Sequence, residues 1–177
     1  MQRRRFIQQS AFATAAIAVA PSLKSYGRND EIILGHNNKR YRINTEWGKL
    51  DFSRYPVKDC HEMVQDKLGR IILLTNETKN NVIIYDKSGK LIKTWGSEYP
   101  GAHGLTLFNE NGEDVLFICD NNRHQVIKTT IDGRVLLTLD YPKETGQYTK
   151  AEEYIPTETI IAPDGDIYVA DGYGKDF

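Results

Sequence analysis

The sequence lacks any long run of hydrophobic residues. Its Ala-rich apolar stretch, Ala11–Ala20, covers about half of the roughly 20 residues that a helix needs to cross a bilayer. Helical periodicity is also not sustained anywhere after this stretch. We therefore expect no stable membrane span, and we expect the remainder of the chain to form something other than a helical domain.

The sequence also lacks a large excess of charge of either sign, and it contains few cysteines. The 23 Lys and Arg residues are balanced by 24 Asp and Glu residues. No basic stripe is present that could neutralise phosphates, so nucleic acid is not an expected partner. The two cysteines, Cys60 and Cys119, fall in different parts of the chain, and Cys119 ends the apolar run VLFIC. This favours buried free thiols over a disulfide.

What the sequence does contain is a segment that recurs about every 45 residues, at 60–96, 102–139 and 156–177. Each copy offers β-branched or aromatic strands separated by a polar break and by a Ser-Gly or Asp-Gly turn. This order predicts one β-propeller blade per copy, and hence an all-β fold. Because a propeller needs several blades that close on themselves, about two and a half blades predict an N-terminal fragment of a longer propeller.

Continuous apolar runs bounded by turn residues predict strands that are buried on both faces. Two strand-like stretches are also expected in 31–51, before the first blade. Within the blades, the runs are Ile71–Leu74, Asn81–Tyr85 and Leu91–Trp95 in the first copy, and Val115–Ile118, Gln125–Lys128 and Val135–Leu139 in the second.

An insertion at 140–155 separates the second and third copies and is rich in Lys, Glu, Tyr and Thr. Most connections of this kind are plain solvated loops on one rim of a propeller. Its tyrosines, Tyr141, Tyr148 and Tyr154, leave open a second interpretation, in which the insertion is a lid or contacts the substrate.

The N-terminus predicts a targeting segment at 1–27, followed by the propeller region at 28–177. Arg3 and Arg4, one further position and Phe6 precede the Ala-rich stretch. This arrangement resembles a twin-arginine export signal, which implies a periplasmic or extracellular protein that folds before transport. The alternative is a basic, frayed N-terminus of a cytoplasmic protein.

Histidines near the start of the first two blades are candidate metal ligands. His103, in Ala102-His103-Gly104, lies at the entry to a first strand, and equivalent positions of all blades converge on the central channel of a propeller. His61 lies 42 residues earlier (103 − 61), at the near-equivalent position. For both, a packed or hydrogen-bonded structural role remains open.

Other polar residues favour structural roles. His124 is expected to be a satisfied turn residue, and His36 a hairpin residue. Asp120 and Asp171 each end a second strand, where short acceptors bind the free N–H groups of the following turn. Tyr173 follows Asp171 between two glycines and could act as an acid or base only if its pKa of about 10 were lowered by a cation.

Three motifs together resemble the lyase module of peptidylglycine α-amidating enzymes, a six-bladed propeller with NHL-type repeats. The stretches are AHGLTL at 102–107, DNNRHQVIK at 120–128 and PTETIIAPDGDIYVADGY at 156–173. The resemblance implies a zinc held by three histidines from different blades, a calcium bound partly by backbone carbonyls, and a catalytic Tyr. It also implies cleavage of a peptidyl-α-hydroxyglycine to an amide and glyoxylate.

Carried onto this sequence, the resemblance implies that His103 is a zinc ligand, that the Leu105 carbonyl is a calcium ligand, and that Tyr173 is catalytic. Two positions depart from the family pattern. Asn76 stands where the family has an Arg, which removes a charge that would stabilise an oxyanion, and Gly174 stands where the family has a Cys.

The sequence thus predicts an exported propeller enzyme, a metal-dependent lyase or hydrolase that acts on a small polar substrate or peptide. A non-catalytic propeller that binds a peptide, glycan or protein partner is the main alternative, because a propeller fold alone does not determine function. A calcium-dependent sugar lactonase is a weaker option, since it would use acidic ligands such as Asp120 and Asp171.

Overall fold

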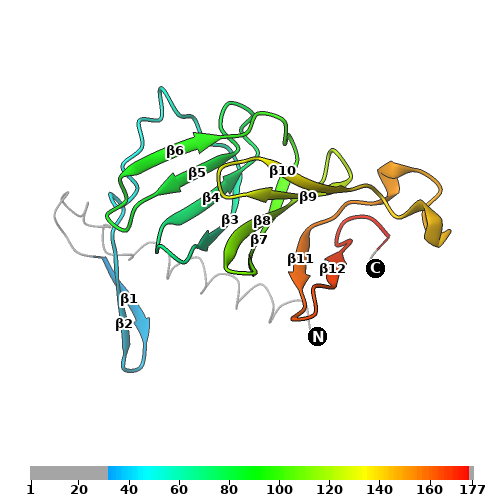
Figure 1. Cartoon of the computed structure of the whole chain (residues 1–177). Coiled ribbons are helices and arrows are strands. Elements are labelled where there is room, and N and C mark those ends of the chain that lie inside the picture. Colours follow the sequence, from blue (N-terminus) through cyan, green and yellow to red (C-terminus); the bar gives the residue numbers. More distant parts are fainter. Residues whose placement is uncertain (1–31, 176–177) are drawn as a thin grey trace, which may run out of the picture. The chain divides into compact units, whose positions relative to one another are not determined.

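The computed structural model describes residues 32–175 (Figure 1). The expected export signal at 1–27 lies outside the described residues. The chain divides into two compact units, 1–44 and 45–177. In the first unit, β1 (Ile32–His36) pairs antiparallel with β2 (Lys39–Ile43), which confirms a pair of strands before the first blade.

The second unit begins with two four-stranded antiparallel sheets. The first sheet, blade 1, has the strand order β3 (Cys60–Gln65), β4 (Ile71–Thr75), β5 (Val82–Tyr85) and β6 (Leu91–Trp95). The second, blade 2, consists of β7 (Ala102–Glu110), β8 (Glu113–Asp120), β9 (Gln125–Thr130) and β10 (Val135–Leu139) in that order. Each sheet is therefore a single up-and-down meander, as a propeller blade requires.

A third, two-stranded sheet follows the insertion. It consists of β11 (Glu158–Ile161) and β12 (Ile167–Ala170), which pair antiparallel. The insertion itself carries two short 3₁₀ turns, η2 (Lys143–Thr145) and η3 (Ala151–Glu153). Within residues 32–175, no helix is both long and apolar enough to cross a membrane. The described part of the chain is thus all-β, as expected.

The sheets pack face to face and bury the central strands β4, β5, β8 and β9, as the sequence predicted. The expectation of burial on both faces is wrong for β6 and β10, because they are the outermost strands of their sheets. Their exposed apolar side chains include Ile92, Val135, Leu136 and Leu137. One core lies between blades 1 and 2, and a second lies between blade 2 and the third sheet. Burying an aliphatic side chain of this size contributes about 1.5–3 kcal/mol, so these two layers are the main source of stability. The first core contains Ile72, Leu74, Val82, Ile84, Leu105, Leu116, Ile118 and Ile127, and the second joins Phe117, Cys119 and Val126 to Ile161, Ile167 and Val169.

The Asp-Gly turn of blade 2 shows why one glycine is needed. Gly133 has a φ of 95°, in the left-handed region that L residues with a side chain rarely adopt. A Cβ atom there would also lie 2.7 Å from the Trp95 ring. The Trp95 indole N–H donates to the carbonyl oxygen of Ile131 at 3.0 Å, so this turn fastens blade 2 to the last strand of blade 1.

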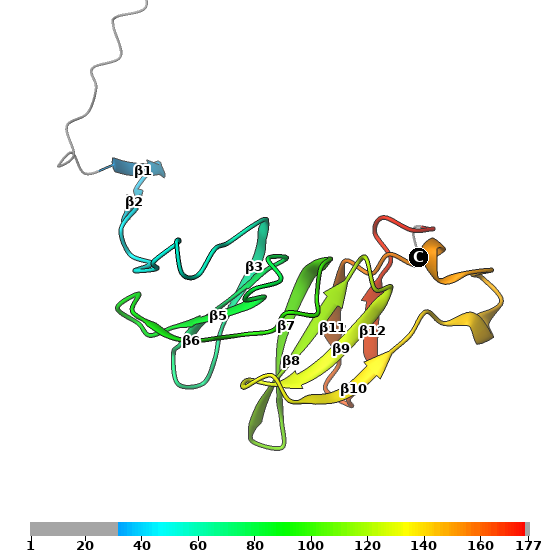
Figure 2. The same cartoon turned by 90° about the horizontal axis from the view of Figure 1, so that it is seen from above.

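The first strands of the three sheets, β3, β7 and β11, lie next to one another along one side of the unit (Figure 2). In a propeller the first strand of each blade is the one nearest the central channel. The free edges of these strands therefore form the surface on which residues from different blades can meet.

Candidate functional site

Three aromatic side chains from three sheets meet at this inner edge. The rings of His61, on β3, and His103, on β7, are stacked with their centroids 4.3 Å apart and an angle of 26° between their planes. The ring of Tyr173, from the turn after β12, meets His103 edge to face at 5.3 Å and 84°. The expected convergence of His61 and His103 is confirmed, and Tyr173 joins them.

His103 is held by Thr157, the residue directly before β11. Its Nδ1 lies 3.0 Å from the carbonyl oxygen of Thr157. Because a carbonyl oxygen can only accept, Nδ1 carries the hydrogen and the lone pair is on Nε2. This is the arrangement found in histidines that bind a metal or act as a base, where the second ring nitrogen is held by a carbonyl or carboxylate.

Two carboxyl groups, those of Glu62 and Glu158, lie near the histidines. Neither of them was identified as a candidate from the sequence. Glu62, next to His61, accepts a hydrogen bond from the Leu105 backbone N–H at 3.0 Å. Burial and a hydrogen bond with the Glu158 carboxyl raise the pKa of Glu62. Although burial opposes it, hydrogen bonds from Glu62, the Thr159 N–H and a nearby hydroxyl lower the pKa of Glu158. Of the two carboxyl groups, Glu62 is therefore the one that binds a proton more readily.

Thr106 ties this pair to β11. Its hydroxyl oxygen lies 2.8 Å from Oε1 of Glu158 and 2.7 Å from both the carbonyl and the hydroxyl oxygen of Thr159. A hydroxyl has one hydrogen to donate and lone pairs to accept with, so it donates to one of the two fixed acceptors and accepts from the Thr159 hydroxyl. These bonds span the inner strands β7 and β11, so they fix the register of one inner strand against the next.

The Leu105 carbonyl, implied as a calcium ligand, lies on the same edge. The N–H and C=O groups of one strand residue point to the same side, and the Leu105 N–H points to Glu62 rather than into the β7–β8 ladder. The placement is therefore compatible with the implied role. Within residues 32–175, however, no group of three or more His, Cys, Asp or Glu residues is arranged to hold a metal ion.

Asp120 and Asp171 have the structural roles that the sequence predicted. Oδ1 of Asp120 accepts from the backbone N–H groups of Gly101, Asn122 and Arg123 at 2.9–3.2 Å. Burial raises the pKa of this carboxyl. Asp171 accepts from the N–H groups of Ile155 at 2.7 Å and of Lys175 at 2.8 Å. Both carboxylates organise the turn that follows their strand.

The insertion at 140–155 is exposed over 143–147 and 149–150, as a solvated loop would be, but two of its tyrosines pack against the protein. Tyr148 and Tyr154 are buried, and their rings meet edge to face at 5.4 Å. The Tyr148 hydroxyl donates to Asp171 at 2.9 Å. Burial, followed by this hydrogen bond, raises the pKa of Tyr148 to about 12. Tyr141 is half-buried. The two buried tyrosines are structural rather than substrate-facing.

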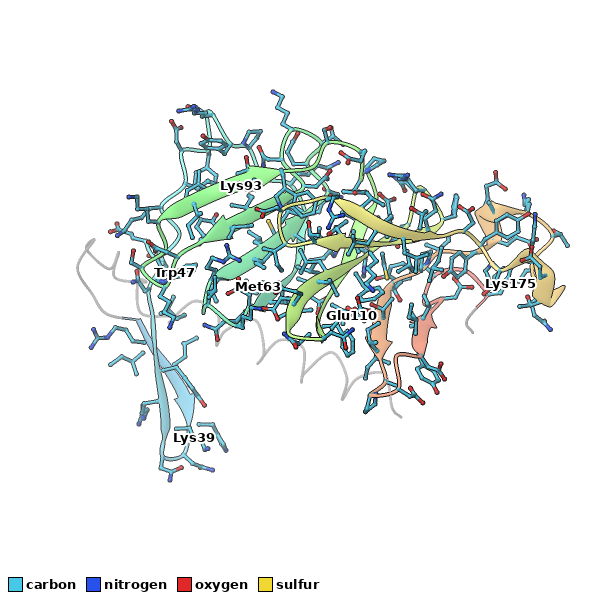
Figure 3. The ribbon with its side chains drawn as sticks, viewed as in Figure 1. Lys39, Trp47, Met63, Lys93, Glu110 and Lys175 are labelled. Atoms are coloured by element: carbon cyan, nitrogen blue, oxygen red, sulfur yellow. The ribbon has the colours of Figure 1, made fainter. Side chains whose placement is uncertain are left out.

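The insertion also holds the segment that carries Tyr173. The Lys175 ammonium pairs with the Glu153 carboxylate at 2.8 Å and donates to the Gln147 carbonyl at 3.0 Å. Figure 3 labels Lys175, which lies beside the insertion. The imidazole of His124 bonds the Tyr154 carbonyl at 2.7 Å, which confirms it as a satisfied turn residue. The turn opposite His103 is thus anchored at both of its ends.

His36 ends β1 in the first unit, where it pairs with Lys39 across the hairpin. Asn76, at the position of the family Arg, donates to the Asp59 carboxylate at 3.0 Å and supplies no positive charge. Both cysteines are free, as expected, but only Cys119 is buried; Cys60 is exposed, because it begins the inner strand β3.

Comparison with known proteins finds a distant relative. No family model matches the chain. The curated protein peptidyl-alpha-hydroxyglycine alpha-amidating lyase 1 of Drosophila melanogaster is 25% identical over 173 residues, which is 95% of this chain and 28% of that protein. The chain therefore spans little more than a quarter of the length of the relative that it matches.

Solved structures give partial likenesses. Selenomethionine-substituted virginiamycin B lyase from Staphylococcus aureus aligns with a TM-score of 0.47 and 14% identity, over 63% of this chain and 34% of that one. A protein of unknown function from Bacteroides caccae aligns with a TM-score of 0.40 and 12% identity, over 75% of this chain and 41% of that one.

Proposed function

We propose that this chain carries part of the active site of a propeller-type lyase similar to the peptidyl-α-hydroxyglycine amidating lyases. The observation that carries the proposal is the edge-to-face contact of His103 and Tyr173 at 5.3 Å. These residues are 70 positions apart (173 − 103) and are the ones to which the resemblance gives a metal-binding and a catalytic role. The distant similarity to an amidating lyase along 95% of the chain supports it.

The reaction sets the requirements of the site. A peptidyl-α-hydroxyglycine loses the proton of its hydroxyl group, the C–O bond becomes a carbonyl, and the C–N bond breaks. The nitrogen leaves with the bonding electrons and takes up a proton, which gives an amide and glyoxylate. The site therefore needs a base near the hydroxyl group and a source of positive charge or hydrogen bonds for the developing oxyanion.

Tyr173 is the proposed base. Its side chain is 63% exposed, so a substrate can reach the phenol oxygen. An ordinary phenol has a pKa of about 10 and is a poor base near neutral pH, so it needs a nearby cation. The proposal is supported by the edge-to-face contact of the two rings, since Nε2 of His103 carries the lone pair that would bind such a cation.

We propose that zinc and calcium are the cations and that His103 and the Leu105 carbonyl each supply one ligand. When bound, the zinc would supply the positive charge that favours the ionised phenol. Within residues 32–175 no group of three or more His, Cys, Asp or Glu side chains could hold a metal ion, so His103 is the one zinc ligand that we assign here. The contribution of this chain is to orient His103 through Thr157 and to place Tyr173 across its ring.

A non-catalytic propeller that binds a peptide is the second candidate, and Asn76 is the observation that favours it. Its amide is neutral and is bound to Asp59, so the position offers no charge to an oxyanion. Binding of a peptide without turnover would support this candidate.

Turnover tests the first candidate. The chain would be incubated with zinc, calcium and a short peptidyl-α-hydroxyglycine, and glyoxylate would be measured. We expect Tyr173→Phe to lower the rate by about 10²–10⁴-fold, the usual contribution of a general base. Tyr168→Phe is the matched control, because Tyr168 is exposed to a similar extent, at 60% against 63%. An equal rate in Tyr173→Phe and in the unaltered protein would contradict the assignment of Tyr173 as the base.

Metal content and export are tested separately. We expect stoichiometric zinc in the purified protein and its loss in His103→Ala, by elemental analysis; equal zinc in both would rule out His103 as a ligand. We also propose that the segment 1–27 directs export to the periplasm or beyond. Replacing Arg3 and Arg4 by Lys should keep the protein inside the cell, and unchanged export would contradict this.

A further inference from the structure

Thr157 of the third sheet lies in a slot between two glycines. A Cβ atom built on Gly104, of β7, would lie 2.4 Å from the Thr157 carbonyl oxygen and 3.0 Å from the Cα of Glu158. A Cβ atom on Gly172, in the turn after β12, would lie 2.7 Å from the Thr157 hydroxyl oxygen and 3.2 Å from its methyl carbon. All four distances are below ordinary van der Waals contact, so neither glycine can be replaced by a residue with a side chain unless the neighbouring atoms move.

Space, not backbone conformation, is the reason for glycine at both positions. Other glycines of this chain, such as Gly133 and Gly165, have a positive φ, at 95° and 96°. Gly104 and Gly172 are not among the positive-φ residues, so an alanine could adopt their backbone angles. A methyl group on either glycine would collide with atoms of Thr157, and one on Gly104 would also meet the Cα of Glu158.

The slot connects the two residues that carry the proposed function. The Thr157 carbonyl accepts the hydrogen of His103 Nδ1 at 3.0 Å, and Gly104 is the residue directly after His103. On the other side, Gly172 directly precedes Tyr173, whose ring meets His103. Thr157 is itself held on β12, since its N–H and its hydroxyl both donate to the Ala170 carbonyl, at 2.8 and 3.1 Å.

We propose that Gly104 and Gly172 are positioning residues of the candidate site. Gly104 lets β11 approach closely enough for Thr157 to fix the Nδ1–H form of His103, which leaves Nε2 free for a ligand or proton. Gly172 lets the following turn close over Thr157, so that Tyr173 lies against His103. The inference rests on the proposed function for its purpose, but the geometry that it assigns can be measured without any substrate.

The two glycines should respond differently to a change in Thr157. The atom nearest a methyl group on Gly104 is a backbone oxygen, which no substitution of Thr157 removes. The atoms nearest a methyl group on Gly172 belong to the Thr157 side chain. With alanine at 157, only its Cβ remains, at 3.5 Å, which is ordinary contact. Thr157→Ala should therefore rescue Gly172→Ala and should not rescue Gly104→Ala.

The experiment uses ¹⁵N NMR of the histidine rings in the full chain at about pH 8, above the ordinary histidine pKa of about 6.5. The signals of His103 are assigned by their loss in His103→Gln. We expect the Nδ1–H form in the unaltered chain and in Thr157→Ala. In Gly104→Ala we expect the Nε2–H form to appear, with or without Thr157→Ala. Gly48→Ala is the control, because no atom lies within 4 Å of its Cβ position.

The ring contact gives the second readout. We expect the nuclear Overhauser effect between the rings of His103 and Tyr173 to be lost in Gly172→Ala and restored in Gly172→Ala with Thr157→Ala. The proposal is overturned if folded Gly104→Ala keeps the Nδ1–H form, or if the double variant does not restore the contact. If Gly104→Ala does not fold, the comparison of Gly172→Ala with and without Thr157→Ala tests the proposal. A chain without lyase activity could still pass both tests. The positioning role of the two glycines and the proposed lyase activity can therefore be refuted independently.

Discussion

His61 and His103 occupy equivalent positions in consecutive blades, yet only His103 is held by a hydrogen bond among the described residues. Its ring is half-buried and bonded to Thr157, whereas the His61 ring is exposed and rests on His103 by stacking. The repeat alone would make the two histidines equal. The difference lies in how closely the next inner strand approaches each histidine.

The residue after each histidine accounts for this difference. Gly104 follows His103 and lets the backbone of the next inner strand approach it. Glu62 follows His61 and reaches the next inner strand with its side chain, which accepts the Leu105 N–H. At His103 the close approach of the backbone lets the Thr157 carbonyl orient the imidazole. At His61 the Glu62 carboxyl group bridges to the next inner strand instead. One position in the repeat therefore decides which blade presents an oriented histidine.

The largest expected effect comes from removing each imidazole in turn. We expect His103→Ala to lower kcat/KM for the peptidyl-α-hydroxyglycine by at least about 10²-fold, because it removes the proposed ligand next to Tyr173. His61→Ala should lower it less than about tenfold, since that ring supplies only a stacking contact. Steady-state kinetics of the two variants would check this. Equal losses would mean that the two histidines act alike.

Removing the side-chain bridge should cost stability. Glu62→Ala leaves the Leu105 N–H without its acceptor, and an unsatisfied buried donor costs about 1–3 kcal/mol. Denaturant unfolding of the full chain measures the change. Glu62→Gln is the matched control, because its amide oxygen can still accept. If Glu62→Ala and Glu62→Gln are equally stable, the hydrogen bond to Leu105 does not hold β3 to β7.

Thr106 sharpens the comparison on the side of His103. Thr106→Val keeps the shape of the side chain and removes the hydroxyl group that bonds Glu158 and Thr159. We expect a loss of about 1 kcal/mol, the net value of a typical hydrogen bond. Thr78→Val, in an exposed turn of blade 1, should leave the free energy of unfolding nearly unchanged. A loss in both variants would point to an effect of valine itself.

The smallest effect is expected from the anchor of the Tyr173 turn. The Lys175 ammonium, followed by the Thr149 N–H, lowers the pKa of Glu153 to about 2. A lowered pKa contributes stability above the ordinary carboxyl pKa of about 4.3, and this is lost as the pH falls toward about 2. Glu153→Gln should therefore melt slightly below the unaltered chain at pH 6, with the difference shrinking from pH 4 to pH 2. A difference independent of pH would exclude the ion pair as its cause.

Much of the fold could be predicted because the central strands are continuous apolar runs. Ile71–Leu74 and Val115–Ile118 are buried between sheets, so the core imposes a pattern that the sequence displays. β3 does not show this pattern, because its sequence CHEMVQ lies at the inner edge and is largely exposed. The strand that carries His61 was therefore the least visible of its blade.

The site was predictable only where a residue type is unusual by itself. His103 and Tyr173 stand out beside glycines, and the repeat length places both His61 and His103 at the inner edge. The pair of Glu62 and Glu158 leaves no such signal, because two glutamates 96 residues apart (158 − 62) meet only through the packing of three sheets. Thr157 was equally invisible, since its contribution to His103 is a backbone carbonyl.

The unequal exposure of the two thiols makes the site easy to observe. The Cys119 thiol is fully buried in the second core, while Cys60 is exposed at the start of β3, one residue before His61. A maleimide dye added to the folded chain should therefore attach to Cys60 alone. No cysteine need be engineered, and the label would sit beside the stacked imidazoles, where its emission could report metal or peptide binding in a single titration.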